Sequence, residues 1–133
     1  MNKVEFTISS ELNNIPQIEI FIDYLMSVFQ IEEKHRGRIT LSTIEAVTNA
    51  ILFGNKRDSQ KKVKVIAAKT VKTIMITVED EGIGFDYRQI PDPTVPQRCM
   101  QAVKKGLYLM LNLTDKLSFT KHGAKVIMTF LLH

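Results

Sequence analysis

The sequence predicts an α+β fold, a two-layer α/β sandwich with a mixed, mostly antiparallel sheet and helices packed on one face. Three observations lead to this prediction. Several short segments alternate apolar and polar residues, as half-buried strands do. Two longer segments repeat apolar residues at helical spacing. The chain has 133 residues, which suits one domain, residues 1–133, with one hydrophobic core.

The N-terminal part is predicted to form a strand followed by a helix. Residues 3–9 alternate apolar and polar side chains, so we expect a half-buried strand there. Asn13 and Asn14 are candidate N-caps for the helix that follows. We expect Gly37 to mark a break before the next helix. The buried stripe of the first helix is predicted to comprise Ile18, Phe21, Ile22, Leu25, Met26 and Phe29.

The second predicted helix carries polar groups beside its buried stripe. That stripe is formed by Ile44, Val47, Thr48, Ile51 and Leu52. At about 100° per residue, Glu45 and Asn49 fall together on the flank next to the stripe. We expect the helix to end near Gly54 and Asn55, a plausible C-cap.

The second half of the chain is predicted to contain four strands and one further helix. Residues 87–104 include three prolines and show no clear period, and a long irregular segment in a compact domain is usually functional or mobile. Helical spacing resumes at residues 107–113. The strands are expected at residues 62–69 and 72–79, joined as a hairpin, and at 115–120 and 125–132.

Composition argues against several kinds of partner. The net charge is +4, but the lysines are dispersed and lack an arginine-rich helix or aromatic platform, so we expect no direct nucleic-acid partner. No apolar run is long enough to cross a bilayer, and no signal-like segment opens the chain. The single cysteine, Cys99, excludes an intrachain disulfide. We therefore expect a cytoplasmic protein without a membrane partner. The three histidines show no metal-ligand spacing, so no metal site built on histidine is expected.

A glycine-rich segment with acidic residues directly follows one predicted strand. It reads Asp80-Glu81-Gly82-Ile83-Gly84-Phe85-Asp86. Two glycines allow the backbone to come close to a flat ligand, and a carboxylate can accept a hydrogen bond from an exocyclic amine such as that of adenine. The alternative is a glycine-rich turn with an exposed acid.

The order of these motifs resembles the GHKL ATPase superfamily, whose domains have the Bergerat ATP-binding fold. Residues 45–49 resemble the N box, residues 80–85 the G1 box and residues 104–109 the G2 box. Within the superfamily, the short chain, Glu45 and the segments 91–94 and 113–117 resemble the branch of anti-sigma-factor serine/threonine-protein kinases.

The resemblance implies an ATP- and Mg²⁺-dependent serine protein kinase that acts as an anti-sigma factor in partner switching. Such a protein binds a sigma factor and phosphorylates a serine of an antagonist of the STAS type, and a homodimer is typical. Glu45 would face the attacking hydroxyl, and Asn49 would ligate Mg²⁺ that bridges the ATP phosphates. Asp80 would hold the adenine amino group in a pocket shaped by Gly82, Ile83 and Gly84.

The same resemblance implies a phosphate loop near the last helix. Gly106, at a helix N-terminus, and Leu107 would present backbone N–H groups to phosphate, which the helix dipole also favours. Lys104, Lys105 and Arg98 would neutralise phosphate charge.

Two alternatives stay open. Lys104 stands where the G2 pattern usually has glycine, which favours a nucleotide-binding regulatory module of the same fold without kinase activity. The catalytic domain of a histidine kinase is weaker, because Glu45 replaces an expected asparagine and we expect no helical hairpin before the domain. The larger chaperone, topoisomerase and mismatch-repair members need further domains.

Overall fold

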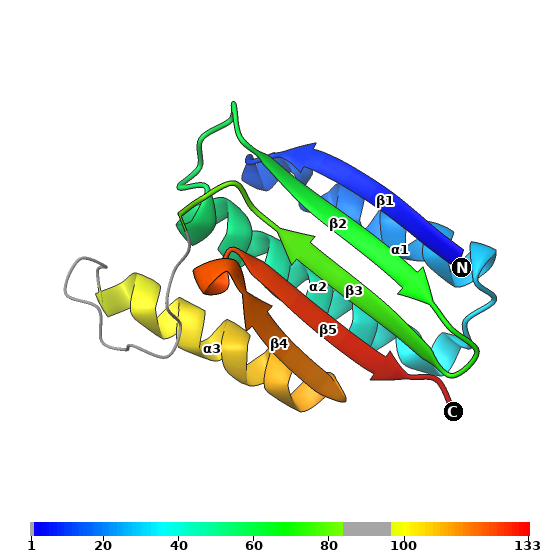
Figure 1. Ribbon diagram of the computed structural model, residues 1–133. Helices are drawn as coiled ribbons and strands as arrows, with labels where there is room; N and C mark the ends of the chain where they lie inside the picture. Colours follow the sequence, from blue (N-terminus) through cyan, green and yellow to red (C-terminus); the bar gives the residue numbers. More distant parts are fainter. Residues whose placement is uncertain (1, 84–96) are drawn as a thin grey trace.

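A computed structural model describes residues 2–83 and 97–133, with residues 97–100 described only as helix backbone. Five strands form one sheet in the order β1-β2-β3-β5-β4 (Figure 1). Each neighbouring pair is antiparallel, which confirms the predicted sheet, with no parallel pair among the described strands. The strands are β1 Asn2–Ser9, β2 Lys62–Lys69, β3 Thr73–Glu79, β4 Lys116–Thr120 and β5 Lys125–Leu131.

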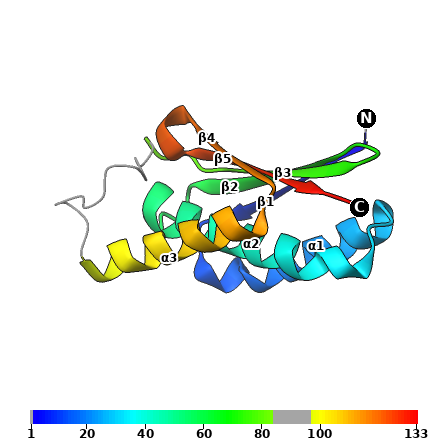
Figure 2. The same cartoon turned by 90° about the horizontal axis from the view of Figure 1, so that it is seen from below.

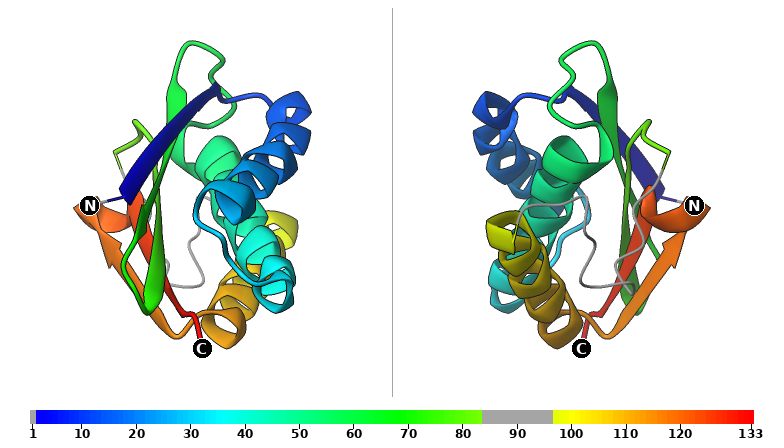
Figure 3. Two further views of the ribbon diagram at one scale, coloured as in Figure 1. Left: turned by 90° about the vertical axis from the view of Figure 1, so that its right-hand side faces the viewer. Right: turned by 90° about the vertical axis from the view of Figure 1, so that its left-hand side faces the viewer.

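Three α-helices cover one face of this sheet (Figures 2 and 3), so the predicted two-layer sandwich is confirmed. They are α1 Pro16–Val28, α2 Arg36–Asn49 and α3 Gln97–Leu113. Helix α2 lies between the other two and continues into a π-helical turn, η3 Ala50–Gly54. Short 3₁₀ turns lie at η1 Leu12–Asn14, η2 Glu33–His35 and η4 Lys121–Gly123. None of the helices in the described ranges is long and apolar enough to cross a membrane.

The hydrophobic core fills the space between sheet and helices. All six residues of the predicted α1 stripe are buried, which confirms that stripe. Strands β2 and β3 bury alternate side chains, as predicted. Each large apolar side chain buried in this way contributes about 1.5–3 kcal/mol to folding. The sheet side of the core includes Val63, Val65, Ala67, Ile74, Ile76, Val78, Met128 and Phe130.

Helix α2 is buried more widely than its predicted stripe. Val47 and Ile51 are fully buried, whereas Ile44 is only half-buried. Ile39 and Ala46, which lie outside the stripe, are buried as well. The reason is the central position of α2, because neighbours on both sides and the sheet cover more of its circumference than one apolar stripe spans.

The predicted helix starts are wrong at two places. Asn14 does not cap α1: its Nδ2 donates to the backbone oxygen of Ser9 at 3.0 Å. Helix α1 instead opens on Pro16, whose missing N–H would have no helical partner in the first turn. Gly37 is not a break, because it lies in the first turn of α2. The chain turns earlier, at Gln30, which has a φ of 52°.

Helix α3 begins well before the predicted start at residue 107. Residues 97–104 belong to the segment predicted to be irregular, yet they form the first half of α3. Val103 and Met110 lie two turns apart and are both buried on the inner face, so packing against α2 and the sheet extends the helix. Residues 87–96 of the predicted irregular segment, like residues 84–86 of the glycine-rich segment, lie outside the described residues.

Candidate functional site

The carboxylate of Glu45 and the amide of Asn49 meet at the inner side of α3. A Cβ atom built on Gly106 would lie 2.9 Å from Oε2 of Glu45 and 3.3 Å from Nδ2 of Asn49. Both side chains therefore point to the same place, as their four-residue spacing on α2 leads one to expect. Only a residue without a side chain fits there without displacing them.

Asn49 holds a polar group that lacks a partner. The residue is 4% exposed, and its Nδ2 has no hydrogen-bond partner among the described residues. An unsatisfied buried polar group costs about 1–3 kcal/mol. The nitrogen and oxygen of an amide are assigned rather than observed, so this position can offer either a donor or an oxygen ligand to a bound group.

Asp80 lies directly after β3 and is buried, with 8% of its surface exposed. Its Oδ1 accepts a hydrogen bond from the backbone N–H of Gly82 at 2.8 Å. Burial raises the pKa of the Asp80 carboxyl from 3.8 to about 6, although the bond from Gly82 acts in the opposite direction. A carboxylate in this setting gains from a further hydrogen-bond donor, and an exocyclic amine supplies one.

Two glycines allow the backbone to pack against this carboxylate. A Cβ on Gly54 would lie 2.2 Å from Oδ2 of Asp80, and one on Gly82 would lie 2.1 Å from the backbone oxygen of Gly54. No larger residue fits at either position without moving the chain. Gly82 was predicted as a site residue, whereas Gly54 was predicted only as a helix cap.

Asn55 is a further residue of the site that the sequence analysis treated only as a cap. It is 1% exposed. Its Oδ1 accepts from the backbone N–H of Glu81 at 2.8 Å, and its Nδ2 donates to Ser10 Oγ at 2.7 Å and to the backbone oxygen of Lys62 at 2.9 Å. Asn55 thus fixes the loop after β3 to the start of β2 and the end of β1. The sequence shows only an asparagine directly after a helix-terminal glycine, which does not reveal these distant partners.

The other residues predicted for the site differ in how exposed their side chains are. Lys104 and Lys105 are exposed on α3, and Ile83 is 92% exposed. Leu107 packs against the core. Arg98 lies in the first turn of α3. Gly84 lies outside the described residues.

Gly106 does not lie at a helix N-terminus, so that expectation is wrong. It lies inside α3, which begins at Gln97. Amides inside a helix bond to carbonyls one turn earlier, and they are not available to a phosphate while α3 keeps this length.

The two groups of residues lie at one end of the molecule. Figure 1 shows the C-terminal end of α2, the loop after β3 and the N-terminal half of α3 side by side there. Gly54 follows Asn49 by five residues, a rise of about 7–8 Å along a helix. Gly54 packs against Asp80, so the π-helical turn η3 connects the two groups.

A divalent cation at this end of the molecule would receive most of its coordinating oxygens from a bound nucleotide and from water. Within residues 2–83 and 97–133, no group of three or more His, Cys, Asp or Glu side chains is arranged to hold a metal ion. Mg²⁺ is often held by only one or two protein oxygens together with substrate phosphates and water. An asparagine oxygen at position 49 beside a nucleotide fits that coordination.

Comparisons with known proteins agree with this geometry. Residues 8–130 match the family described as Histidine kinase-like ATPase domain. An anti-sigma F factor of Clostridium perfringens is 30% identical over 131 residues, which cover 95% of this chain and 92% of that protein. The anti-sigma F factor of another strain of this species is 34% identical over 84 residues, 63% of this chain and 59% of that protein.

A solved structure has the same fold. It contains the RsbU and RsbW domains of a Mycobacterium tuberculosis protein and superimposes with a TM-score of 0.67 at 15% sequence identity. The match covers 98% of this chain, which spans 32% of that longer chain.

Proposed function

This chain belongs to the histidine kinase-like ATPase domain family, and from that premise we propose that it is an ATP-dependent serine protein kinase acting as an anti-sigma factor. In this function it binds a sigma factor and phosphorylates a serine of a STAS-type antagonist, so that the two partners exchange. The observation that carries the proposal is the convergence of Glu45 and Asn49 on one point near the Asp80 loop.

Asp80 is proposed to recognise the adenine ring. Its buried carboxylate accepts a hydrogen bond from the exocyclic amine, and the closely packed Gly54 and Gly82 keep side chains out of the space beside it. An adenine amine offers the donor that the carboxylate gains from in this setting. Gly84 belongs to the same proposed pocket, as does Ile83.

Asn49 and the basic residues of α3 are proposed to bind the phosphates. The Asn49 side chain has an unpartnered polar atom among the described residues and faces the right space for a Mg²⁺ ligand. Lys104, Lys105 and Arg98 supply positive charge near the triphosphate. The bound Mg²⁺ neutralises charge that develops on the phosphates during transfer.

Glu45 is proposed to position the attacking serine hydroxyl. A free glutamate has a pKa of about 4.3 and is a weak base toward a hydroxyl. Phosphoryl transfer proceeds through a loose transition state in which orientation matters more than full deprotonation. A half-buried carboxylate next to the Mg²⁺ ligand is well placed to accept the hydroxyl hydrogen bond.

The test is the variant Glu45→Gln, assayed with labelled ATP and a candidate antagonist protein. Phosphotransfer should fall by about a hundredfold or more, while calorimetric ATP affinity stays within about twofold. Glu19→Gln, an exposed carboxylate on α1, serves as the matched control and should retain full activity. Unchanged phosphotransfer in Glu45→Gln would refute the role of Glu45.

A second candidate function is a nucleotide-gated binding module without catalysis. Lys104 favours it, because a side chain stands where the family pattern has a glycine of the phosphate loop. The same assay separates the two functions, since a pure binder transfers no phosphate even in the wild-type protein. A cytoplasmic setting, a homodimer and the identities of both partners stay predictions.

A further inference from the structure

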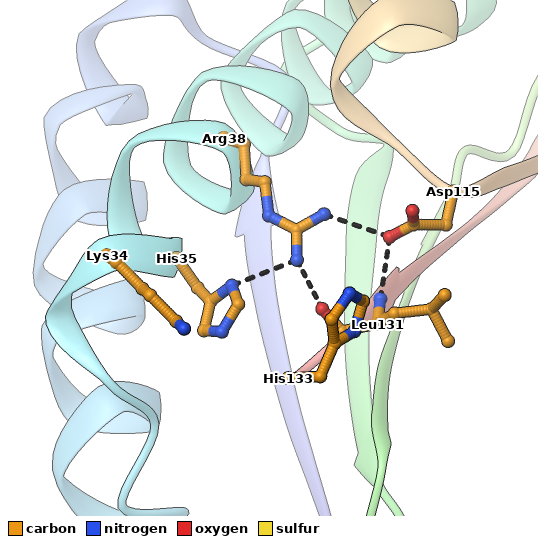
Figure 4. Close-up of a pocket in the computed structure, with 6 residues that line it drawn as sticks. All are labelled: Lys34, His35, Arg38, Asp115, Leu131 and His133. Atoms are coloured by element: carbon orange, nitrogen blue, oxygen red, sulfur yellow. Dashed lines mark hydrogen bonds and ion pairs between the residues drawn. The ribbon is translucent and has the colours of Figure 1, made fainter.

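A second polar pocket lies at the opposite end of α2 from the proposed nucleotide site. It has a volume of about 280 Å³, far more than the roughly 30 Å³ that a water molecule occupies in the liquid. Figure 4 shows its side chains gathered around the guanidinium of Arg38. The lining residues are Lys34, His35, Arg38, Asp115, Leu131 and His133.

The hydrogen bonds of His35 determine which ring nitrogen carries the proton. Nδ1 of His35 lies 2.9 Å from Nη2 of Arg38. A guanidinium only donates hydrogen bonds, so Nδ1 is the acceptor and the proton of the neutral ring is on Nε2. His35 is 6% exposed, and this Nε2 has no partner among the described residues. The pocket wall therefore contains a buried donor in need of an acceptor.

Arg38 is held in place and keeps this ring fixed. Its Nη1 donates to Oδ2 of Asp115 at 2.9 Å, and its Nη2 also donates to the backbone oxygen of Leu131. The guanidinium carbon lies 5.5 Å from the centre of the Phe130 ring. Oδ2 of Asp115 also accepts from the backbone N–H of Leu131 at 2.7 Å. The side-chain carboxylate of Asp115 is thus engaged by Arg38 and Leu131 and does not serve His35.

The remaining surroundings of His35 are positively charged. Burial, then the charges of Arg38 and Lys34, lower the pKa of the ring, and His133 acts in the same direction while Glu32 opposes it. His35 is also the residue that precedes α2, and this helix start has no side-chain cap and no acidic residue in its first turn. Helix N-termini favour negative charge. A cationic rim, an uncapped helix start and an unpartnered donor all favour the same kind of ligand.

We propose that this pocket binds a small oxyanion, a phosphate or carboxylate group, that accepts the Nε2–H of His35 and the ammonium of Lys34. The neutral His35 ring orients the anion through its Nε2–H hydrogen bond, while Lys34 and Arg38 supply the positive charge that attracts it. The ammonium of Lys34 pairs with the Glu32 carboxylate at 4.0 Å, and both side chains are exposed. Such an exposed pair contributes only about 0–1 kcal/mol, so an anion can compete with Glu32 for Lys34. This site is separate from the nucleotide site and does not depend on the proposed function.

The test follows the histidine rings of the full chain by long-range ¹H–¹⁵N correlation at pH 7. Sodium phosphate and sodium acetate are titrated against sodium chloride at matched ionic strength. We expect the Nε2–H tautomer for His35 and a saturable shift of its Nε2 signal, with the exposed His122 as internal reference. A response to phosphate alone assigns a tetrahedral oxyanion, and a response to acetate as well assigns the broader carboxylate class.

Variants locate the effect. Lys34→Gln should weaken the anion response of His35 by about fivefold or more, whereas Lys3→Gln, which removes an exposed charge on β1, should leave it unchanged. In His35→Phe, the rise in melting temperature caused by the anion should disappear. The Nδ1–H tautomer, no saturable shift with either anion, or an equal response in Lys34→Gln would overturn the proposal.

Discussion

Asp80 combines burial with a function that needs its charge, so stability and binding oppose each other at this residue. Its pKa is raised to about 6 by burial, so between about pH 4 and pH 6 the folded protein binds more protons at this site than the unfolded chain. The ionised carboxylate therefore destabilises the fold increasingly as pH rises through that window.

The variant Asp80→Asn should for this reason be more stable than the wild type above pH 6, by about 1–3 kcal/mol, the upper figure corresponding to the full rise of the pKa from 3.8 to about 6. Urea unfolding of both proteins between pH 4 and pH 8 measures the difference. It should be small at pH 4, grow up to about pH 6 and then level off. A difference that does not change with pH would contradict the raised pKa.

Asn55 is predicted to position the loop that carries Asp80. In Asn55→Ala, the backbone N–H of Glu81 loses its acceptor and the connections to Ser10 and Lys62 disappear. Loss of such buried bonds should destabilise the fold by about 1–3 kcal/mol and weaken ATP binding about tenfold. Asn112→Ala is the control, because its exposed side chain bonds only within α3; equal effects of both changes would refute the assignment.

For single residues, the sequence predicted a role in the site where the hydrogen-bond partners are neighbours in the chain. Asp80 and Gly82 form their hydrogen bond two residues apart, and the strand-glycine pattern pointed to them. The partners of Asn55 are distant in sequence, since Ser10 and Glu81 come next to it only when β1, β2 and β3 pair. No local pattern could reveal that contact.

Helix α3 is the element whose structure departs most from expectation. Gly106 was expected at a helix start because residues 104–109 resemble the G2 box. Within the folded protein its missing side chain instead permits close contact with Glu45 and Asn49 of α2. Gly106 therefore marks a close contact between α2 and α3 and not a helix boundary. The two cases look alike in the sequence, and only the packing of the helices distinguishes them.

A pair of glycine-to-alanine changes tests that contact. Gly37→Ala adds a Cβ with nothing within 4 Å in the first turn of α2, and should stabilise the protein by about 0.5–1 kcal/mol. Gly106→Ala should lack this gain, because its Cβ crowds Asn49 and forces Glu45 aside, and its phosphotransfer rate should fall. Thermal unfolding and the labelled-ATP assay measure both effects. Equal stabilisation with full activity in both variants would refute a close contact at Gly106.

The length of α3 should change when ATP binds. If the amides of Gly106 and Leu107 are to reach a phosphate, the preceding turns must release their helical hydrogen bonds. Hydrogen exchange should therefore become faster at residues 97–105 with ATP bound, while residues 108–113 stay protected. Full protection of α3 in the complex would exclude backbone binding of phosphate by Gly106.

At the scale of the whole molecule, alternation and helical spacing predicted the layers, but not the order of the strands. β5 lies between β3 and β4 in the sheet, an arrangement set by how β4 and β5 pack on α3 and the core rather than by any local pattern. The family match covers residues 8–130, which include both α2 and the loop after β3.

The most direct test of the account is calorimetric titration of the full chain with ATP, with and without Mg²⁺. The account predicts saturable binding of one nucleotide per chain, tighter with Mg²⁺, weakened in Asn49→Ala and abolished in Asp80→Asn, with GTP bound poorly. An absence of binding heat at several temperatures, or ATP affinity that Asp80→Asn leaves unchanged, would contradict a nucleotide site at this end of the molecule.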